Sequence, residues 1–278
     1  YVPNNMAICL SGDFDPDQMI ATIDKYFGGL KPNPDLPKLD LPKETPMTAP
    51  VVREILGPDA ESVALAWRFP GAADKDVETL QVVSQILYNG QAGLIDLDLT
   101  QQQKTLSAYC YPMTMSDYSA FMMQGRPKQG QTLDEVKDLL LGELKKLREG
   151  DFDEKMLEAN INNFKLYQMQ QLENNDARAD MFVESFVNGS DWADEVTALD
   201  RMSKLTKDDI VAFANKYLKD DNYAVIYKKQ GKDPNEKKMS KPEITPIVMN
   251  RDTVSTFLKE IQASVVTPIE PVFLDYSK

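Results

Sequence analysis

The chain has 278 residues, of which 42% are hydrophobic and 27% charged, so it has the composition of a globular protein with an ample core. Its net charge of −13 argues against nucleic acid or an anionic membrane surface as a partner, because both call for a basic surface. The chain contains no histidine, so the commonest metal ligand and the commonest general base are both missing.

The opening stretch has the pattern of a strand, a tight turn and a helix. Met6–Leu10 is an apolar run of strand length, and Asp15 is a natural N-cap for a helix that ends near Phe27. We expect the strand to be buried in the sheet of a layered domain and the helix to lie back on that sheet. Because Tyr1 leads straight into this unit, we interpret the chain as a piece of something longer.

A proline-stiffened connector over 28–50 follows, and alternating apolar residues then predict a sheet. Two of its strands have the spacing of an antiparallel hairpin, namely Leu106–Tyr111 and Tyr118–Gln124. The complete set of expected strands is Met6–Leu10, Val51–Leu56, Ser62–Phe69, Leu106–Tyr111, Tyr118–Gln124 and Asn222–Lys228.

Helix signals occupy the gaps between these strands and the long stretch before the last one. About six strands interleaved with and followed by helices predict an α+β domain, with a mostly antiparallel sheet and helices on one face. The expected helix starts are a cap at Asp74, a short helix from Leu94 to Gln103, and capping boxes at Thr132 with Glu135, Asp151 with Glu154, and Thr206 with Asp209.

The composition shifts from Lys229 onward, where the chain becomes charged and proline-punctuated. Val254–Ala263 is a short amphipathic helix, and Val265–Tyr276 has strand character with no helix to pack on. We therefore expect one domain over residues 1–230. Residues 231–278 are expected to form a linker, a short helix and an unpaired strand that leads to a further domain.

Acidic clusters do not match a metal site. Asp13, Asp15 and Asp17 suggest a calcium loop, but Gln18 and Asp24 stand where that loop requires glycine and glutamate. Helix capping explains the cluster instead. A second acidic row has the spacing of a solvated helix face: Glu173, Asp176, Asp180 and Glu184.

No catalytic constellation emerges from the residues. Cys9 and Cys110 lie in apolar runs and are expected to be buried free thiols, without a histidine to activate either one. Serine nucleophiles lack a base for the same reason. The Gly90–Gly93 segment is too short to cradle phosphate and does not follow a strand.

The first 30 residues resemble the insulinase/pitrilysin family of zinc metallopeptidases. The likeness rests on a Tyr-x-Pro-x-Asn-Met segment, a Gly-Asp turn and an Asp-Pro helix start that ends near Tyr-Phe-Gly. It continues through VALAWRFPG, the helix over Asp76–Leu87, the stretch from Leu94, and the closing KLTKDDIVAFANKYLKDDNYAVIYKK. The resemblance thus covers about residues 1 to 230.

This resemblance implies an enzyme of several homologous domains with the LuxS and mitochondrial-processing-peptidase-like metallohydrolase fold, arranged as two halves around a chamber. The family's zinc lies in the first domain, on a His-x-x-Glu-His helix that this sequence lacks. The chain then corresponds to the second, non-catalytic domain of the first half. It would hold no zinc or other cofactor and no catalytic residue, while the parent's upstream catalytic domain would hold zinc.

The partners implied are the catalytic domain and the second half of the same parent chain, together with peptide substrates. A bacterial periplasmic location suits such a peptidase. The resemblance also implies an exosite for the N-terminal end of a substrate, although the residues by themselves favour a turn in which Gly90 and Gly93 simply break a helix. Its matching positions are Tyr88, Asn89, Gly90, Gln91, Ala92, Gly93, Leu94, Leu106, Ser107, Ala108 and Tyr109.

Three functions remain open at this point. The first is a domain that walls the proteolytic chamber and holds peptide. The second is a catalytically inactive family member that acts as a structural or partner subunit. The third is a free-standing peptide-binding module, which the unpaired apolar strand at Val265–Tyr276 disfavours.

Overall fold

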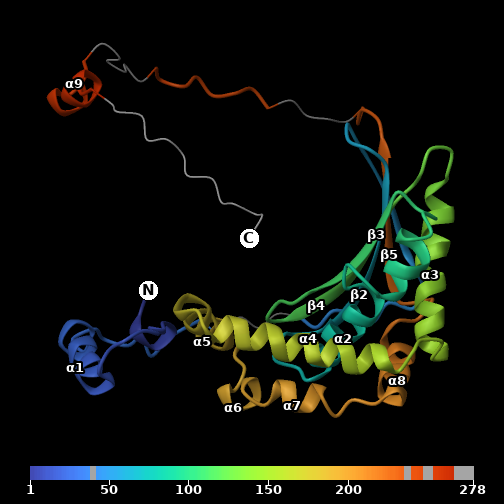
Figure 1. Cartoon of the computed structure of the whole chain (residues 1–278), viewed down its shortest axis with the longest axis horizontal. Helices are drawn as coiled ribbons and strands as arrows, with labels where there is room; N and C mark the ends of the chain where they lie inside the picture. The colour runs from blue at the N-terminus through green and yellow to red at the C-terminus, as the bar shows by residue number, and fades with distance from the viewer. Residues whose placement is uncertain (38–41, 235–238, 247–252, 266–278) are drawn as a thin grey trace, which may run out of the picture. The chain divides into compact units, whose positions relative to one another are not determined.

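The computed structural model describes residues 1–37, 42–234, 239–246 and 253–265 (Figure 1). It divides into two compact units, Tyr1–Pro234 and Asn235–Lys278. The described part of the second unit contains the helix α9 (Thr256–Ala263), close to the expected 254–263. The strand expected over Val265–Tyr276 lies, apart from its first residue, outside the described residues.

A five-stranded sheet forms the centre of the first unit, in the order β1-β5-β2-β4-β3. The expected antiparallel hairpin is confirmed, because β3 pairs with β4 from Ser107↔Arg126 to Met113↔Ala120. The strands are β1 (Val51–Gly57), β2 (Ser62–Pro70), β3 (Ser107–Met113), β4 (Tyr118–Arg126) and β5 (Tyr223–Gln230).

One detail of the expected sheet was wrong. The sheet has five strands in the described residues rather than about six, because Met6–Leu10 pairs with none of them. The expected mostly antiparallel pairing is confirmed, because β2 with β4, β2 with β5 and β3 with β4 are antiparallel, while β1 runs parallel to β5. The parallel pair follows from the chain path. After the last long helix the chain returns between β1 and β2 rather than beside an edge.

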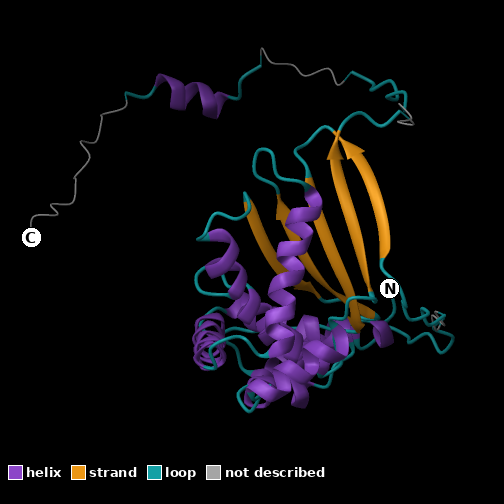
Figure 2. Cartoon of the chain, turned by 90° about the vertical axis from the view of Figure 1, so that its right-hand side faces the viewer, coloured by secondary structure: helices purple, strands orange, loops and turns teal. Residues whose placement is uncertain are grey.

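Alternation along β2 and β4 builds the core under the helices. Val63, Leu65 and Trp67 point to one side of β2 and are at most 1% exposed, as is Phe121 on β4. A period of two places these side chains on one face of the sheet. Figure 2 shows most helices of the first unit gathered on one side of the sheet, as expected for this α+β class.

The capping boxes at Thr132 with Glu135 and at Thr206 with Asp209 are confirmed at the starts of α3 and α8. The expected cap at Asp74 is also confirmed, because its Oδ1 accepts from the Asp76 N–H at 2.8 Å. The capping box expected at Asp151 with Glu154 was wrong by two residues, since Asp153 Oδ1 accepts from the Lys155 N–H at 2.9 Å. The helices of this body are α2 (Asp76–Leu87), α3 (Leu133–Glu149), α4 (Lys155–Leu172), α5 (Asn175–Asn188), α6 (Trp192–Glu195), α7 (Ala198–Met202) and α8 (Lys207–Tyr217).

The N-terminal segment differs from its expected burial. A short 3-10 turn, η1 (Pro3–Asn5), precedes Met6–Leu10, and α1 (Pro16–Phe27) begins at the expected Asp15 cap, where the carboxylate accepts from the Gln18 N–H. Neither Met6–Leu10 nor α1 contains a buried residue. Cys9 is accordingly only half-buried, whereas Cys110 is buried as expected, and both thiols are free. The apolar pattern was recognised correctly, but no sheet of the described residues covers it.

Candidate functional site

The turn after α2 is held by its own side chains. Tyr88 ends the helix, and its N–H donates to the Ser84 carbonyl at 2.8 Å. The Asn89 side-chain oxygen then accepts from the backbone N–H groups of Gln91 and Ala92, at 3.0 and 2.8 Å. This is an Asx-type turn, so the exposed tip at Gly90–Ala92 has a defined backbone.

A buried carboxylate fixes the same turn from below. Asp96 is 4% exposed and begins the short π-helical segment η2 (Asp96–Thr100). Its Oδ2 accepts from the backbone N–H groups of Asn89 and Gly93, both at 3.0 Å. The short helix expected from Leu94 to Gln103 is therefore present in reduced form, and its first acidic residue ties the turn down.

Both glycines of the turn are required by its geometry. Gly90 has a φ of +80°, the left-handed region that glycine adopts without strain. A Cβ on Gly93 would lie 2.6 Å from the Leu87 carbonyl oxygen, which is closer than any real contact. The turn therefore breaks the helix, and it also presents a rigid tip.

The strand next to this turn is at the edge of the sheet. Among the described residues β3 pairs on one side only, with β4. The Tyr88 and Tyr109 rings lie 6.3 Å apart, so the turn and the strand meet, and Tyr111 continues the row 6.1 Å from Tyr109. Leu106, just before the strand, is 67% exposed. The two separate stretches expected for the site are thus brought together.

Not every expected site residue faces outward. Gly93, Leu94 and Ala108 are buried, so they support the surface from the core. Gly90, Gln91, Ala92 and Leu106 are exposed. The remaining members are partly exposed: Tyr88, Asn89, Ser107 and Tyr109.

Two residues under the turn were missed by sequence reasoning. Asp96 stands three residues after Gly93, a spacing typical of side chains that accept from a nearby backbone N–H. Asn160 on α4 carried no local signal, yet it is 2% exposed and its Oδ1 accepts from the Asn89 amide at 3.3 Å. Its own amide nitrogen has no partner among the described residues.

Cys110 lies in β3 on the core side of this surface. Its thiol donates to the Ser84 carbonyl at 3.7 Å. Burial raises the pKa of this thiol far above its usual range, and the nearby Asp96 carboxylate acts in the same direction. Cys110 is therefore a packing residue and no nucleophile.

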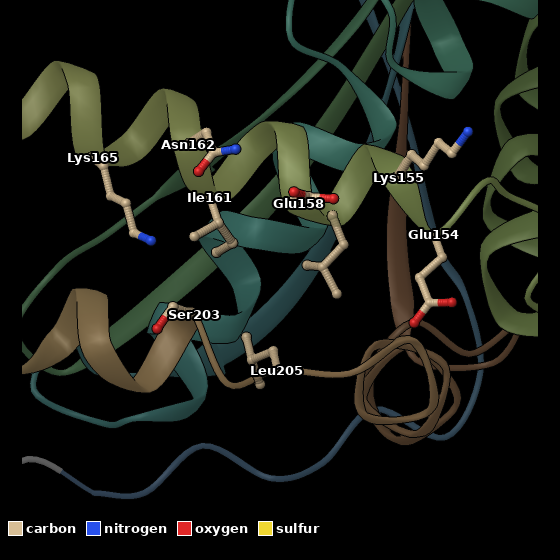
Figure 3. Close-up of a pocket in the computed structure, with 9 residues that line it drawn as sticks. Glu154, Lys155, Glu158, Ile161, Asn162, Lys165, Ser203 and Leu205 are labelled. Carbon is tan, nitrogen blue, oxygen red and sulfur yellow. The ribbon is translucent and has the colours of Figure 1, made fainter.

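Away from this turn, a pocket of about 510 Å³ lies between α4 and the loop before α8 (Figure 3). Figure 3 shows Glu158, Asn162 and Lys165 on α4 across from Ser203 and Leu205. The lining mixes both signs of charge with apolar side chains. It contains no nucleophile paired with a base, so it does not indicate a reaction.

The described side chains do not form a metal site. In the described residues no group of three or more His, Cys, Asp or Glu side chains could hold an ion. The acidic residues Glu173, Asp176, Asp180 and Glu184 are all exposed, as expected. They do not share one helix face, however, because Glu173 caps the end of α4 and the other three lie on α5. What the geometry of the candidate site offers instead is an unpaired strand edge beside a rigid turn.

Sequence and structure comparisons give one consistent family. The profile of the peptidase M16 inactive domain matches residues 1–164. The zinc protease PqqE of Helicobacter pylori is 24% identical over 235 residues, which are 82% of this chain and 52% of that protein. The chain thus spans about half the length of the curated relative that it matches.

Solved structures share the fold. A protease from Helicobacter pylori matches with a TM-score of 0.72 and 22% identity, over 79% of this chain and 53% of that one. A peptidase M16 inactive domain from Pseudomonas fluorescens matches with 0.67 and 16%, over 79% and 52%. The periplasmic protease PqqL from Escherichia coli matches with 0.61 and 14%, over 78% and 26%. Within the described residues, no helix has the length and apolar character needed to cross a membrane.

Proposed function

Since the chain belongs to the peptidase M16 inactive domain family, we propose that it is the non-catalytic domain of a zinc metalloendopeptidase. In this proposal residues 1–230 wall the proteolytic chamber, and 231–278 lead toward a second half. The parent's catalytic domain holds the zinc and cuts the peptide. A periplasmic location is part of the proposal, and the similarity to a periplasmic protease of Escherichia coli supports it.

Substrate is held, in this proposal, where the turn after α2 meets β3. The supporting observation is the contact between Tyr88 and Tyr109, which joins a rigid turn to an unpaired strand edge. A peptide in extended form adds to such an edge through backbone hydrogen bonds, with little demand on its sequence. The exposed tip at Gly90–Ala92 then limits how far the peptide's N-terminal end reaches.

Metal content tests the enzymatic half of the proposal. We expect about one zinc per chain in the full-length parent and none in the 278-residue chain, as the ligand chemistry of zinc peptidases requires. Inductively coupled plasma mass spectrometry of both purified proteins measures the zinc content per chain. Stoichiometric zinc in the 278-residue chain would overturn the assignment. A parent without zinc would favour the inactive partner subunit instead.

A charge substitution tests the peptide site. Leu106→Lys places a cation where the N-terminal amine of a substrate would approach in this proposal, at a position that is 67% exposed. We expect the KM of the parent for an unstructured fluorogenic peptide to rise about tenfold with kcat unchanged. An N-acetylated peptide should be affected less, because its terminal charge is gone.

The matched control is Ile55→Lys on the opposite edge strand β1, where the side chain is 51% exposed. It adds the same charge to the other edge of the same sheet and should leave the KM unchanged. Equal effects of the two variants would remove the case for a site at β3.

A further inference from the structure

Helix α1 has an apolar face that the described residues cover only in part. Met19, Ile20, Ile23, Tyr26 and Phe27 recur at helical spacing. Ile20, Tyr26 and Phe27 are 63%, 70% and 46% exposed. Met19 and Ile23 are half-buried, and no residue of the helix is fully buried. A 12-residue helix is marginal in water by itself, so this face requires a packing partner.

Met6–Leu10 is an extended segment whose apolar side chains are also exposed. Met6, Ile8 and Leu10 alternate along the chain and are 43%, 46% and 44% exposed. The backbone at Met6 is extended, with φ −136° and ψ 147°, yet the segment has no strand partner among the described residues. Alternating apolar side chains on an unpaired extended backbone need a sheet edge, which a small ligand or a lipid surface does not offer.

An apolar groove continues this surface onto the body of the unit. It has a volume of about 440 Å³ and is lined by Leu172 at the end of α4, Phe182 on α5 and Trp192 on α6. Ser11, directly after Leu10, also lines it, and its hydroxyl donates to the Asn175 side chain at 3.2 Å. On α5 the neighbouring side chains of Phe186 and Val187 are exposed as well. One partner could therefore cover both the segment and the groove.

The chemistry of this surface defines its occupant. A strand, a glycine turn and a helix pack as a unit only against a sheet whose face the helix covers. A second copy of this chain would bring a second net charge of −13, which opposes close association. The relatives carry about as much chain again beyond the matched part, which is enough for another domain.

We propose that residues 6–27 belong structurally to another α+β domain of the parent protein. That domain takes Met6–Leu10 as an additional strand, packs its sheet against the apolar face of α1, and rests on the groove formed by α4, α5 and α6. The proposal rests on the proposed function in one respect, namely that the chain is part of a larger protein.

Hydrogen–deuterium exchange tests the strand. The amides of Met6–Leu10 should exchange at least about tenfold more slowly in the full-length parent than in the 278-residue chain, because pairing protects them. The amides of β2, which is paired in both proteins, serve as the internal reference. Equal exchange of Met6–Leu10 in the two proteins would overturn the proposal. A parent that contains zinc and cuts peptide but shows equal exchange would keep the proposed function and remove this inference alone.

Ile20→Asp tests the helix face, with Ala21→Asp as the matched control on the opposite side of α1. We expect Ile20→Asp to lower the Tm of the parent by about 5 °C and to leave the Tm of the 278-residue chain unchanged, since the charge is buried only in the parent. Ala21→Asp should change neither. A 278-residue chain that forms a dimer by light scattering, and loses it with Ile20→Asp, would assign the surface to a second copy and overturn the proposal.

Discussion

Two segments of this chain carry the same sequence pattern and have opposite environments. Residues 6–27 and residues 62–87 both run from an apolar strand-like stretch through a turn into an amphipathic helix. In the second segment Leu65 is fully buried and α2 packs on the sheet. In the first, Ile8 is 46% exposed and α1 buries nothing. Periodicity therefore reports that a face must be covered, and it does not report what covers it.

Backbone pairing explains the difference between the two segments. β2 has a neighbour on each side, β4 and β5, so its hydrogen-bonding groups are satisfied within the unit. Met6–Leu10 has no such neighbour in the described residues. The second segment is stable because the chain itself supplies its sheet, and the first depends on a sheet from elsewhere.

The largest loss in the free energy of unfolding is expected for a substitution in the buried strand β2. The Trp67 ring stacks on Tyr223 at 5.0 Å, and its indole N–H donates to the Lys219 carbonyl at 3.0 Å. Trp67→Ala should lower the free energy of unfolding by about 3–5 kcal/mol, measured by urea denaturation. Trp192→Ala, at a position that is 37% exposed, should cost about 1 kcal/mol or less. Similar losses for both would contradict the contrast between covered and uncovered surface.

A smaller loss in the free energy of unfolding is expected for a substitution in the turn after α2. Asp96→Ala removes the acceptor for the Asn89 and Gly93 N–H groups and leaves two backbone donors without a partner. We expect a loss of about 1–3 kcal/mol in the free energy of unfolding, with faster amide exchange at Gly93. The exposed Glu173→Ala serves as the control and should be neutral. Unchanged exchange at Gly93 would show that the turn holds without the carboxylate.

The alkylation rates of the two cysteine thiols provide a further test of the difference between the two segments. Cys9 is half-buried in the uncovered segment, and Cys110 is buried in the body. Because burial raises the pKa of Cys110, its reactive thiolate fraction stays small as the pH rises to about 9. Iodoacetamide should label Cys9 at least about tenfold faster than Cys110, as measured by peptide mass spectrometry. Equal rates in the native chain would mean that the sheet opens readily.

The smallest effect is expected on the uncovered helix. Ile20→Ala should change the free energy of unfolding of the 278-residue chain by no more than about 0.5 kcal/mol, because the side chain is already 63% exposed. Urea denaturation measures this change in the free energy of unfolding. A loss above 1 kcal/mol would show that α1 packs within this chain, and the distinction between the two segments would disappear.

The parts of the fold that follow from local signals were predictable. The capping boxes at Thr132 and Thr206 each depend on two residues three positions apart. The alternation in β2 and the hairpin of β3 and β4 are similarly local. The position of β5 between β1 and β2 was not predictable, because no local pattern encodes which distant strands become neighbours.

Some residues of the candidate site were likewise expected from the sequence, and others were not. The turn at Tyr88–Leu94 and the strand start at Leu106–Tyr109 followed from a family resemblance, and whether they bind peptide stays a prediction. Asp96 and Asn160 support the turn through hydrogen bonds that cross between segments. The spacing of Asp96 from Gly93 is a local signal that could have indicated its role, whereas the sequence carries no signal for the bond between Asn89 and Asn160, which are 71 residues apart.

The place of β5 also sets an order of assembly. Val51 at the start of β1 pairs with Ala224, so β1 has no neighbour in the described residues until almost the whole first unit has been synthesised. β2, β3 and β4 can associate early, whereas β1 must wait for the final strand to enter between it and β2. A nascent chain stopped before Tyr223 would hold an open sheet with an apolar edge, and this interval is when chaperones or proteases would have access to it.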